Sequence, residues 1–481
     1  MKNIKYIHLL FIPLLSIALL SCKKETYDPN PAEAHLTWVK NVKMVLNGVE
    51  IQGKINEGKK EIIFPKVAAN ANLSAISFKG ELPNGAKFEN EKYDFTPDEG
   101  NSFTKKSIKI VNNNRFREYF VTINLSVPPV GAGFAQAKVY NFSASGTKYP
   151  SFSTATSARV ADMDLTHVLV VGRDLEPHLL LLSDLKKGVI SPIAMSQTGV
   201  AGGGGSSRNA GRLINGNAYI SNLTTAFNTG SNPVKVYHWK TSAPELPPTV
   251  VAEYRRADVP GQNDAQTDRY GDMTSIDLDA NGNGYIFVKG NNLSSFLRIK
   301  VTNFTSTSEP TIISPGTSLG GWAAYNEVEG AKGSYLYTGH QGPLRLCDAG
   351  GAIAYTLPAT TLANVDGVGA RIITFNGARY LIAVNNILLG ATIAVYDLTK
   401  GGSTQEALEI FNNADALGKA PVYTFALGAS LPSGNAAVQI SWVKDGNNKL
   451  YIIGSGVEAG FAIVEFPQAT ETDPFDNFVV D

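Results

Sequence analysis

The sequence lacks an excess of charge of either sign. Lysine plus arginine and aspartate plus glutamate each total 42, so the formal net charge is zero. No basic stripe is present, and electrostatic capture of nucleic acid or anionic lipid is therefore not indicated. After Leu20 the chain also lacks any apolar run that approaches the ~18 residues of a membrane-spanning helix, so no second membrane segment is expected.

Histidine and cysteine, which often bind metals or act as nucleophiles, are scarce. The six histidines include no HxH or HExxH spacing, so no zinc site is indicated. Of the two cysteines, Cys347 lies in an alternating strand-like run and is interpreted as a small buried core residue. The other, Cys22, stands between an apolar run and a charged run, which gives it a different meaning.

The N-terminal residues have the pattern of an export signal. Lys2 and Lys5 precede a twelve-residue apolar segment at 9–20 that is too short to span a bilayer comfortably. This pattern predicts a signal peptide over 1–21. The letters LLSC that end it resemble the lipobox of bacterial lipoproteins, and the resemblance implies that Cys22 is acylated and becomes the first residue. An ordinary signal peptide with an incidental cysteine is the alternative.

A lipid on Cys22 would make a membrane the first partner of this protein. Two acyl chains and an amide-linked third would hold it there essentially permanently, and no intrachain disulfide could then form. Residues 22–35 are polar and contain proline, which predicts a tether. The acidic residues Glu25 and Asp28 partly resemble signals that send Gram-negative lipoproteins through the outer membrane. We therefore expect an outer-membrane location, with cell-surface display favoured over a periplasm-facing position.

Residues 36–127 are predicted to form a first domain, an antiparallel β-sandwich. Its strand-like runs are VKMVLNG (42–48), KEIIFP (60–65), LSAISF (73–78), SIKIV (107–111) and REYFVTINLSV (117–127). Turn residues such as Asn47-Gly48 separate the runs. The segment 93–123 resembles the small immunoglobulin-like modules of bacterial surface lipoproteins, which usually act as spacers. The Pro- and Gly-rich residues 128–133 predict a linker.

Residues 134–470 contain a repeat of strand, turn and strand. The six segments with this pattern are 158–172, 207–222, 274–288, 322–339, 370–384 and 438–454. The third strands expected after them are 178–185, 234–240, 296–301, 344–349, 392–398 and 461–466, and the runs 249–254 and 352–357 fit a fourth strand. Four strands per repeat predict a six-bladed β-propeller, with seven blades as the alternative. Residues 471–481 are expected to form a C-terminal tail.

The order of these modules resembles a family of uncharacterised Gram-negative lipoproteins. The resemblance covers most of the chain and implies an N-terminal immunoglobulin-like module followed by a β-propeller-like domain. The repeats carry no signature of a named propeller class, such as a Trp-Asp blade ending.

Motifs that imitate catalytic or metal sites have simpler interpretations. GTSLG (316–320) matches G-x-S-x-G, but Pro315 precedes it and a β-type run follows it, so we interpret it as a turn. DLDANGNG (277–284) imitates the start of a calcium loop but lacks the closing glutamate. A hairpin is the main interpretation there, and a calcium site is the alternative. The calcium candidates are Asp277, Asp279 and Asn281.

The densest polar segment, at 254–272, is the predicted binding loop. Long loops on a rigid scaffold often carry function, and this one offers forked donors, acceptors and an aromatic ring suited to a carbohydrate or a peptide. A solvated loop with internal ion pairs is the alternative. The candidate ligand-binding residues are Arg255, Arg256, Asp268, Arg269, Tyr270 and, outside the loop, Trp322.

The sequence therefore predicts a non-catalytic cell-envelope protein whose propeller binds a glycan or a partner protein. The alternative is a carbohydrate-active hydrolase or lyase on the same scaffold. The first is preferred, because no acid–base, nucleophile or metal constellation stands out in the sequence. No catalytic residue and no cofactor beyond the calcium alternative is expected.

The anchor gives the first testable prediction. Cys22→Ser should release the protein from membranes into the soluble extracytoplasmic fraction, because Cys22 is the one lipid attachment site inferred. Membrane sedimentation followed by immunoblotting of both fractions measures this. Continued sedimentation of the variant with membranes would contradict a sole anchor at Cys22.

Overall fold

The fold is nearly all-β, as the sequence predicts. The computed structural model describes residues 35–98, 101–126, 129–154, 156–201, 204–227, 229–260, 268–291, 294–306, 308–319, 322–339, 342–362, 369–385, 390–428, 437–470, 475 and 478–480. Over these residues the α-helices are α1 (Leu182–Leu185) and α2 (Thr404–Asn413). Neither is long and apolar enough to cross a membrane. Cys22 and the signal peptide lie outside the described residues.

The chain divides into two compact units. Residues 1–128 together with 470–481 make up the first unit, and residues 129–469 make up the second. The chain therefore leaves the first unit before residue 129 and returns to it at the C-terminus. Lys54 Nζ donates a 2.6 Å hydrogen bond to the backbone oxygen of Phe475, and Asn56 Nδ2 donates one of 3.0 Å to that of Val479.

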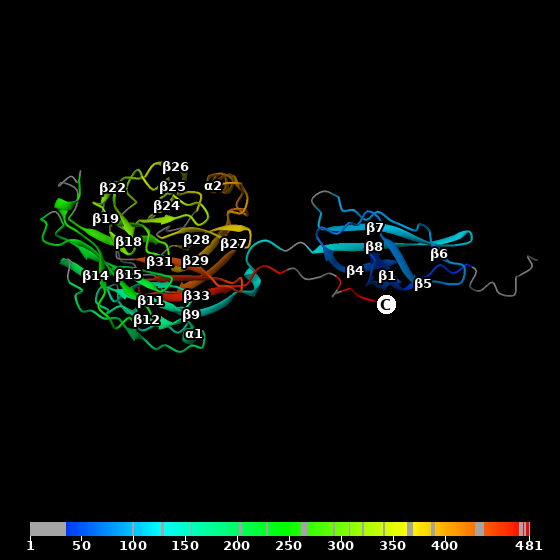
Figure 1. Ribbon diagram of the computed structural model, residues 1–481, viewed down its shortest axis with the longest axis horizontal. Helices are drawn as coiled ribbons and strands as arrows, with labels where there is room; N and C mark the ends of the chain where they lie inside the picture. The colour runs from blue at the N-terminus through cyan, green and yellow to red at the C-terminus, as the bar shows by residue number, and fades with distance from the viewer. Residues whose placement is uncertain are drawn as a thin grey trace, which may run out of the picture. The chain divides into compact units, whose positions relative to one another are not determined.

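Two sheets share one apolar core in the first unit (Figure 1). The smaller sheet has the order β2 (Val49–Gln52), β1 (Lys40–Leu46), β5 (Ser77–Glu81). The larger has the order β3 (Lys54–Asn56), β4 (Glu61–Ala68), β8 (Arg115–Ser126), β7 (Phe103–Asn112), β6 (Lys87–Phe88). Met44 of β1 and Phe64 of β4 are fully buried in the shared core.

The first unit departs from the predicted pattern in two places. The prediction of antiparallel pairing is wrong for β4 and β8, which pair in parallel, because the chain crosses through β5, β6 and β7 between them. The predicted strand at 73–78 begins only at Ser77. Asn72 Oδ1 accepts hydrogen bonds from the backbone nitrogen (3.1 Å) and hydroxyl (2.7 Å) of Ser74, which fixes a turn there.

The second unit contains consecutive antiparallel sheets (Figure 1). The first has β10 (Ala158–Met163), β11 (His167–Gly172), β12 (His178–Leu181) and β13 (Ile193–Ala194); the second has β14 (Gly204–Ile214), β15 (Asn217–Thr224), β16 (Val234–Lys240) and β17 (Thr249–Tyr254). The third has β18 (Tyr270–Leu278), β19 (Gly284–Gly290), β20 (Phe296–Thr302), β21 (Thr305–Ser306) and β22 (Thr311–Ile313), and one pair, Thr224 with Tyr270, connects it to the second.

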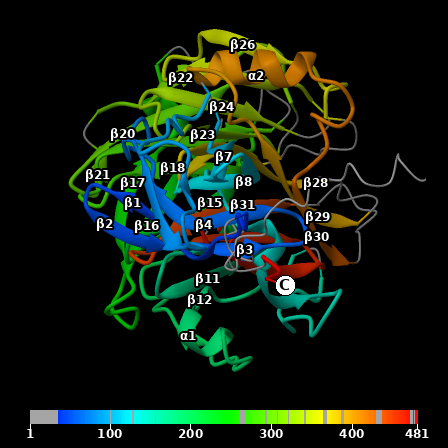
Figure 2. The same ribbon diagram turned by 90° about the vertical axis from the view of Figure 1, so that its right-hand side faces the viewer.

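Three further sheets complete the second unit. The fourth has β23 (Ala324–Glu327), β24 (Ser334–Thr338), β25 (Leu344–Asp348) and β26 (Ile353–Leu357); the fifth has β27 (Arg371–Phe375), β28 (Ala378–Asn385), β29 (Ala391–Asp397) and β30 (Tyr423–Gly428). The sixth has β31 (Val438–Lys444), β32 (Leu450–Gly456), β33 (Gly460–Phe466) and β9 (Lys138–Ser143). Helix α2 lies beside β26 (Figure 2) and buries Leu408 and Phe411.

The six strand–turn–strand segments predicted from the sequence are all antiparallel strand pairs. The turn residues explain two of them directly. Asn215-Gly216 and Asn376-Gly377 have φ values of 46° and 78° and of 46° and 76°, the left-handed conformation that tight hairpins require. The predicted strand at 178–185 is wrong beyond Leu181, because α1 follows. Its Leu182 and Leu185, spaced for one helical turn, are both buried.

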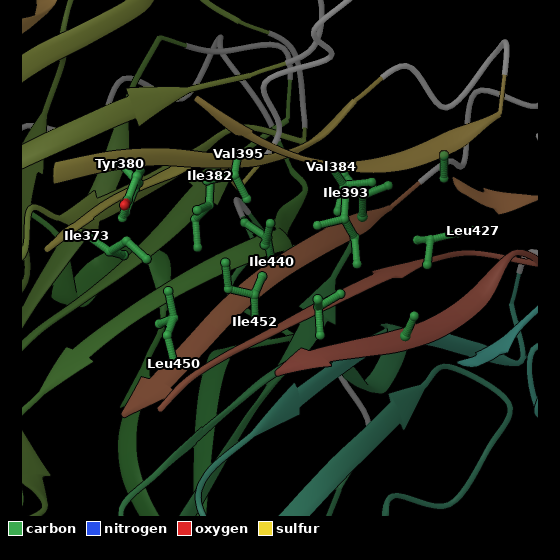
Figure 3. Close-up of a cluster of buried hydrophobic side chains, with 14 of the residues drawn as sticks. Ile373, Tyr380, Ile382, Val384, Ile393, Val395, Leu427, Ile440, Leu450 and Ile452 are labelled. Carbon is green, nitrogen blue, oxygen red and sulfur yellow. The ribbon is translucent and has the colours of Figure 1, made fainter. Parts of the chain in front are cut away.

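Strand β9 is the first strand of the second unit but belongs to its last sheet. It pairs with β33 over its whole length, from Lys138 opposite Glu465 to Ser143 opposite Gly460. Between the fifth and sixth sheets, apolar side chains such as Ile382, Ile393 and Ile452 interdigitate with no exposure to solvent (Figure 3). Each such side chain contributes about 1.5–3 kcal/mol by leaving water.

Removing β9 should destabilise the second unit much more than removing the first unit does. We expect residues 129–469 to melt cooperatively, and residues 144–469 to lose that transition, because β9 supplies the buried Tyr140 and Phe142. Each buried aromatic ring lost costs about 3–5 kcal/mol, against a total domain stability of about 5–15 kcal/mol. Calorimetry of the two fragments checks this, and equal melting temperatures would contradict a structural role for β9.

Candidate functional site

The first strand of each sheet in the second unit carries buried polar side chains. Apolar residues fill most of the other strands, so this concentration needs a reason. The buried polar residues on these strands are Arg159, Asp162, Asn209, Arg212, Asp272, Thr274, Ser275, Asn326, Arg371, Gln439 and Ser441.

Several of these side chains bond each sheet to the next. The first three sheets are joined by the bonds Leu213 N to Asp162 Oδ2 (2.9 Å) and Ser221 Oγ with Thr274 Oγ1 (2.7 Å). The third, fourth and fifth sheets are joined by Tyr325 N to Ser275 Oγ (2.8 Å) and Asn326 Nδ2 to Ala370 O (3.2 Å). The fifth sheet is joined to the sixth by Arg371 Nε to Ile440 O (2.9 Å), and the sixth to the first by Ala161 N to Ser455 Oγ (2.9 Å). They satisfy buried polar groups that would otherwise cost about 1–3 kcal/mol each. Their role is therefore structural.

Two ion pairs lie in the same region, and in each of them the positive charge of an arginine balances the negative charge of an aspartate. Arg212 Nε lies 3.0 Å from Asp162 Oδ2, and Arg371 Nη1 lies 3.9 Å from Asp277 Oδ1. Burial lowers the pKa of Arg371 to about 9, with Arg212 adding to the effect and the two aspartates opposing it. Burial raises the pKa of Asp277. We call these four residues the neutral quartet, because two cations face two carboxylates.

A second group of charged residues lies where the first strands begin. We call it the cationic cluster. Its members are Arg159 of β10, Arg173 directly after β11, Arg269 directly before β18, Lys289 of β19, and Asp272 of β18. Arg269 Nε donates a 2.7 Å hydrogen bond to Asp272 Oδ2, and Arg173 Nη2 lies 3.3 Å from Asp272 Oδ1. Two guanidinium groups therefore contact the carboxylate of Asp272.

Asn209 fixes the geometry of the cationic cluster. Its Oδ1 accepts a 2.7 Å hydrogen bond from Arg173 Nε, while its Nδ2 donates to the backbone oxygens of Gly271 (2.6 Å) and Asp272 (2.9 Å). Gly271 has φ of 96°, and a Cβ there would lie 2.2 Å from the backbone oxygen of Asn222. A glycine is therefore required beside Asp272, and the carboxylate is held in one position.

Burial and like charge both act on the basic groups of the cluster. Burial, followed by repulsion from Arg173, lowers the pKa of Arg159 to about 9, and Asp272 opposes the shift. Burial also lowers the pKa of Lys289 to about 7, and the negative charge of Asp272 opposes this shift. Both side chains are fully buried, whereas those of Arg173 and Arg269 are 12% and 33% exposed. Arg173 and Arg269 are therefore the basic members of the cluster whose side chains solvent reaches.

One predicted binding residue belongs to the cationic cluster. That residue is Arg269, which binds Asp272 through two of its nitrogens. Its neighbour Tyr270 is 1% exposed, with its ring centroid 4.8 Å from that of Phe227, so it is part of the core. Asp268 is exposed, and its backbone oxygen accepts a 3.1 Å hydrogen bond from Phe227.

The remaining predicted residues lie apart from the cluster's bonded contacts. Arg255 Nη2 lies 3.7 Å from Glu253 Oε1, with the arginine side chain 57% exposed. Arg256 begins the 3-10 helix η2 (Arg256–Asp258). Trp322 is partly buried against the apolar core of the fifth and sixth sheets. Residues 261–267 of the predicted binding loop lie outside the described residues.

The calcium candidates take part in separate hydrogen bonds. Asp279 Oδ1 accepts hydrogen bonds of 2.9 Å from the backbone nitrogens of Asn281 and Asn283, so its carboxylate closes the hairpin turn. Asp277 Oδ2 accepts a 3.2 Å hydrogen bond from Glu327 N, on the next sheet. In the described part of the chain, no three histidine, cysteine or acidic side chains gather in a way that could hold a metal ion.

Sequence reasoning missed Arg159, Arg173 and Lys289. A signal was present, because each is a basic residue inside or directly beside an apolar strand-like run, as in ARVADM and YIFVKG. A long basic side chain inside such a run is rarely buried without a partner. Only the fold shows that Arg173 meets Asp272, and that Asp272 acts on Arg159 and Lys289.

Alanine substitutions should separate the core part of 254–272 from its exposed part. Tyr270→Ala removes a buried ring and should cost about 3–5 kcal/mol of the free energy of unfolding. Arg255→Ala, at an exposed position with a long ion pair, should change it by less than about 0.5 kcal/mol. Chemical denaturation of both variants measures this. A stable Tyr270→Ala protein would show that this ring is not part of the core.

The chain is similar to known proteins of one family. The model of a family described as a domain of unknown function, DUF4623, matches residues 28–469. A crystal structure of a DUF4623 family protein from Bacteroides eggerthii is 32% identical, with a TM-score of 0.78, and the match covers 92% of this chain and all of that one. A protein of unknown function from Bacteroides caccae is 12% identical, with a TM-score of 0.33 over 62% of this chain and 89% of its own. No curated protein matches. The chain therefore belongs to the DUF4623 family.

Proposed function

We propose that this protein is a lipid-anchored, outer-membrane binding protein whose second unit is a six-bladed β-propeller that holds a glycan without transforming it. The observation that carries the proposal is the contact of Arg173, from the first sheet, and Arg269, from the third, with the one carboxylate of Asp272. Both arginine side chains are partly exposed and act on the buried Arg159, whose pKa is lowered, and shifted pKa values of this kind are typical of functional sites.

The propeller is supported by the order and connection of the sheets. Six antiparallel sheets follow one another along the chain, and the N-terminal β9 completes the last of them. Side-chain hydrogen bonds connect each sheet to its neighbour and the sixth to the first, through Ala161 and Ser455. A ring of sheets whose first and last strands pair is how propellers close. Among the described strands, a seventh group of this kind is not present.

The location and the role of the first unit are supported by sequence. The lipobox-like residues ending in Cys22 favour an anchor, and the polar residues that follow favour a tether. The first unit, with two sheets over one core, fits an immunoglobulin-like sandwich that acts as a spacer. Cell-surface display is favoured over a periplasm-facing position, as the acidic residues after the anchor suggest.

The pairing of the buried carboxylates with arginine favours binding over cleavage by a hydrolase or a lyase. A glycosidase needs two carboxyl groups, one able to donate a proton and the other to act as a base or nucleophile. Asp162, Asp272 and Asp277 on the first strands each lie beside arginine. Asp162 also accepts backbone hydrogen bonds, which give it a structural role. In the described part of the cluster, Arg173 and Arg269 offer N–H donors, and the carboxylate between them, Asp272, is paired with both.

Incubation with polysaccharides should show binding without turnover. The protein, purified with Cys22 replaced by serine, should retain a glycan on an affinity gel while the reducing ends and the absorbance of unsaturated products stay constant. An increase in reducing ends without new ultraviolet absorbance would establish the hydrolase alternative, and an increase in both would establish the lyase. Retention of an envelope protein in place of every glycan would assign the second unit to protein binding.

A further inference from the structure

We propose that the first unit docks on a membrane surface through one side of its β7–β8 hairpin, with phenylalanine rings in the bilayer interface and lysine side chains at the lipid phosphates. The surface goes beyond the glycan binding proposed for the second unit. It rests on the proposed function only for the lipid anchor, which brings the first unit to the membrane. We call it the hairpin face, and it carries Phe103, Lys105, Lys109, Phe116 and Phe120.

The alternation of the strands separates the hairpin face from the core. Strands β7 and β8 pair in an antiparallel hairpin over their whole length (Figure 1). On β8, Tyr119 and Val121 are fully buried in the core of the first unit, so Phe116 and Phe120 point to the other side of the sheet. Phe120 lies opposite Ser107, which places the odd-numbered residues of β7 on that side as well.

The three phenylalanines of the hairpin face are strongly exposed. Phe103, Phe116 and Phe120 are 49%, 63% and 45% exposed, whereas a core phenylalanine of the same unit, Phe64, is fully buried. Phe116 and Phe120 are four residues apart on β8, and Phe103 pairs with Asn124, four residues further on. At about 3.4 Å per residue, they recur along the hairpin every 14 Å or so, at about one third of its length each. Single exposed apolar residues are ordinary, but three on one side of one hairpin indicate a binding surface.

Lysine accompanies two of these rings. Lys105 Nζ lies 5.8 Å from the centroid of the Phe120 ring, and Lys109 Nζ lies 5.2 Å from that of Phe116. A lysine whose apolar stem lies beside a ring, with its ammonium group in water, suits the boundary between the acyl chains and the headgroups of a bilayer. The hairpin face therefore presents an apolar layer and a charged layer together.

Charge favours an anionic bilayer over a neutral one. Residues 103–126 contain five basic residues and one acidic residue, Glu118, although the chain as a whole has a net charge of zero. Carboxylates of the neighbouring chain bind two of the five, Glu61 at Lys105 and Glu57 at Arg117. We therefore assign the main attraction to the rings and the choice of anionic lipid to the lysines beside them.

The position of the first unit in the chain brings the hairpin face to the membrane. Cys22, the predicted lipid attachment site, precedes the first described residue, His35, by thirteen positions. A chain of that length spans at most about 45 Å when fully extended, so an anchored first unit stays within that distance of the bilayer. A short tether gives an effective concentration in the millimolar range. A surface with weak intrinsic affinity is therefore sufficient.

Other occupants fit the hairpin face less well. Phenylalanine has neither the hydroxyl of tyrosine nor the N–H of tryptophan, so its ring offers a sugar or a peptide no hydrogen bond. A second copy related by twofold symmetry would bring Lys105 and Lys109 toward the same lysines of its partner, where like charges repel. An anionic bilayer accepts the rings and provides phosphates for the ammonium groups.

Sedimentation with lipid vesicles tests the inference. The protein is made from residue 22 onward with Cys22→Ser, so that neither the predicted signal peptide nor a lipid contributes. The probes are phosphatidylcholine vesicles with and without phosphatidylglycerol, at up to millimolar lipid. We expect binding to the anionic vesicles, and Phe116→Ser and Phe120→Ser should each weaken it at least about fivefold. Lys105→Gln and Lys109→Gln should each weaken it about fivefold on anionic vesicles and less on neutral ones.

Matched variants on the smaller sheet of the first unit are the controls. Val49, at 62% exposure, is as exposed as Phe116 but lies on β2. Val49→Ser and Lys79→Gln, on β5, should leave vesicle binding unchanged. All these positions are exposed, so melting temperatures should stay close to that of the parent protein, and melting curves check that each variant is folded.

A fluorescent label reports which surface meets the lipid. With Cys22 replaced, Cys347 is the remaining cysteine, and it is buried. An environment-sensitive dye on Ser107→Cys, opposite Phe120, should shift its emission to shorter wavelength when anionic vesicles are added. The same dye on Lys79→Cys should not shift.

Three results would overturn the inference. If neither vesicle binds the protein at millimolar lipid, the hairpin face does not hold an anchored protein to the membrane either, because the tether supplies no higher concentration. If Phe116→Ser and Val49→Ser bind vesicles equally well, another surface is responsible. A dimer in sedimentation velocity that Phe116→Ser dissociates would assign the face to a second copy. None of these results touches the glycan binding of the second unit, and a failure of the anchor itself would show in the fractionation of Cys22→Ser.

Discussion

In the second unit, side chains on the first strands form hydrogen bonds to the neighbouring sheet. These bonds fix the position of each sheet against the next, which apolar packing alone could not do. Hydrophobic packing, such as that of the core that contains Ile393 and Ile452, is strong but tolerates sliding. The hydrogen bond that Leu213 N donates to Asp162 Oδ2 does not tolerate sliding, because it is directional and buried. The sheets are therefore fixed in register, and the charged side chains at the starts of their first strands have defined positions.

This constraint makes the cationic cluster possible. Asp272 is placed by Asn209, and Asn209 belongs to the neighbouring sheet, so the carboxylate that organises the arginines depends on contact between sheets. Removing the charged side chains of Arg159 and Lys289 from water opposes folding. The many fully buried apolar side chains of the same unit offset that cost. A scaffold of this size can thus hold a charge arrangement that a small sheet could not.

The sequence predicted the strands well and the site poorly, for one physical reason. Strand pairs such as 370–384 are specified locally, by alternation of apolar residues and by an Asn-Gly turn. The predicted binding loop at 254–272 was selected by polarity and length, which do not show where a side chain points. Arg269 proved to lie in the cationic cluster, whereas Tyr270, one residue later, lies in the core.

By itself the sequence determined the all-β class, the repeat and most strand positions, because each depends on residues close together in the chain. It also carries the lipobox-like segment around Cys22. Tertiary structure decided the rest. The pairing of β9 with β33 joins residues more than 300 positions apart, as Tyr140 opposite Ile463 shows. The meeting of Arg173 with Asp272 depends likewise on how two sheets pack, and no local pattern specifies that contact.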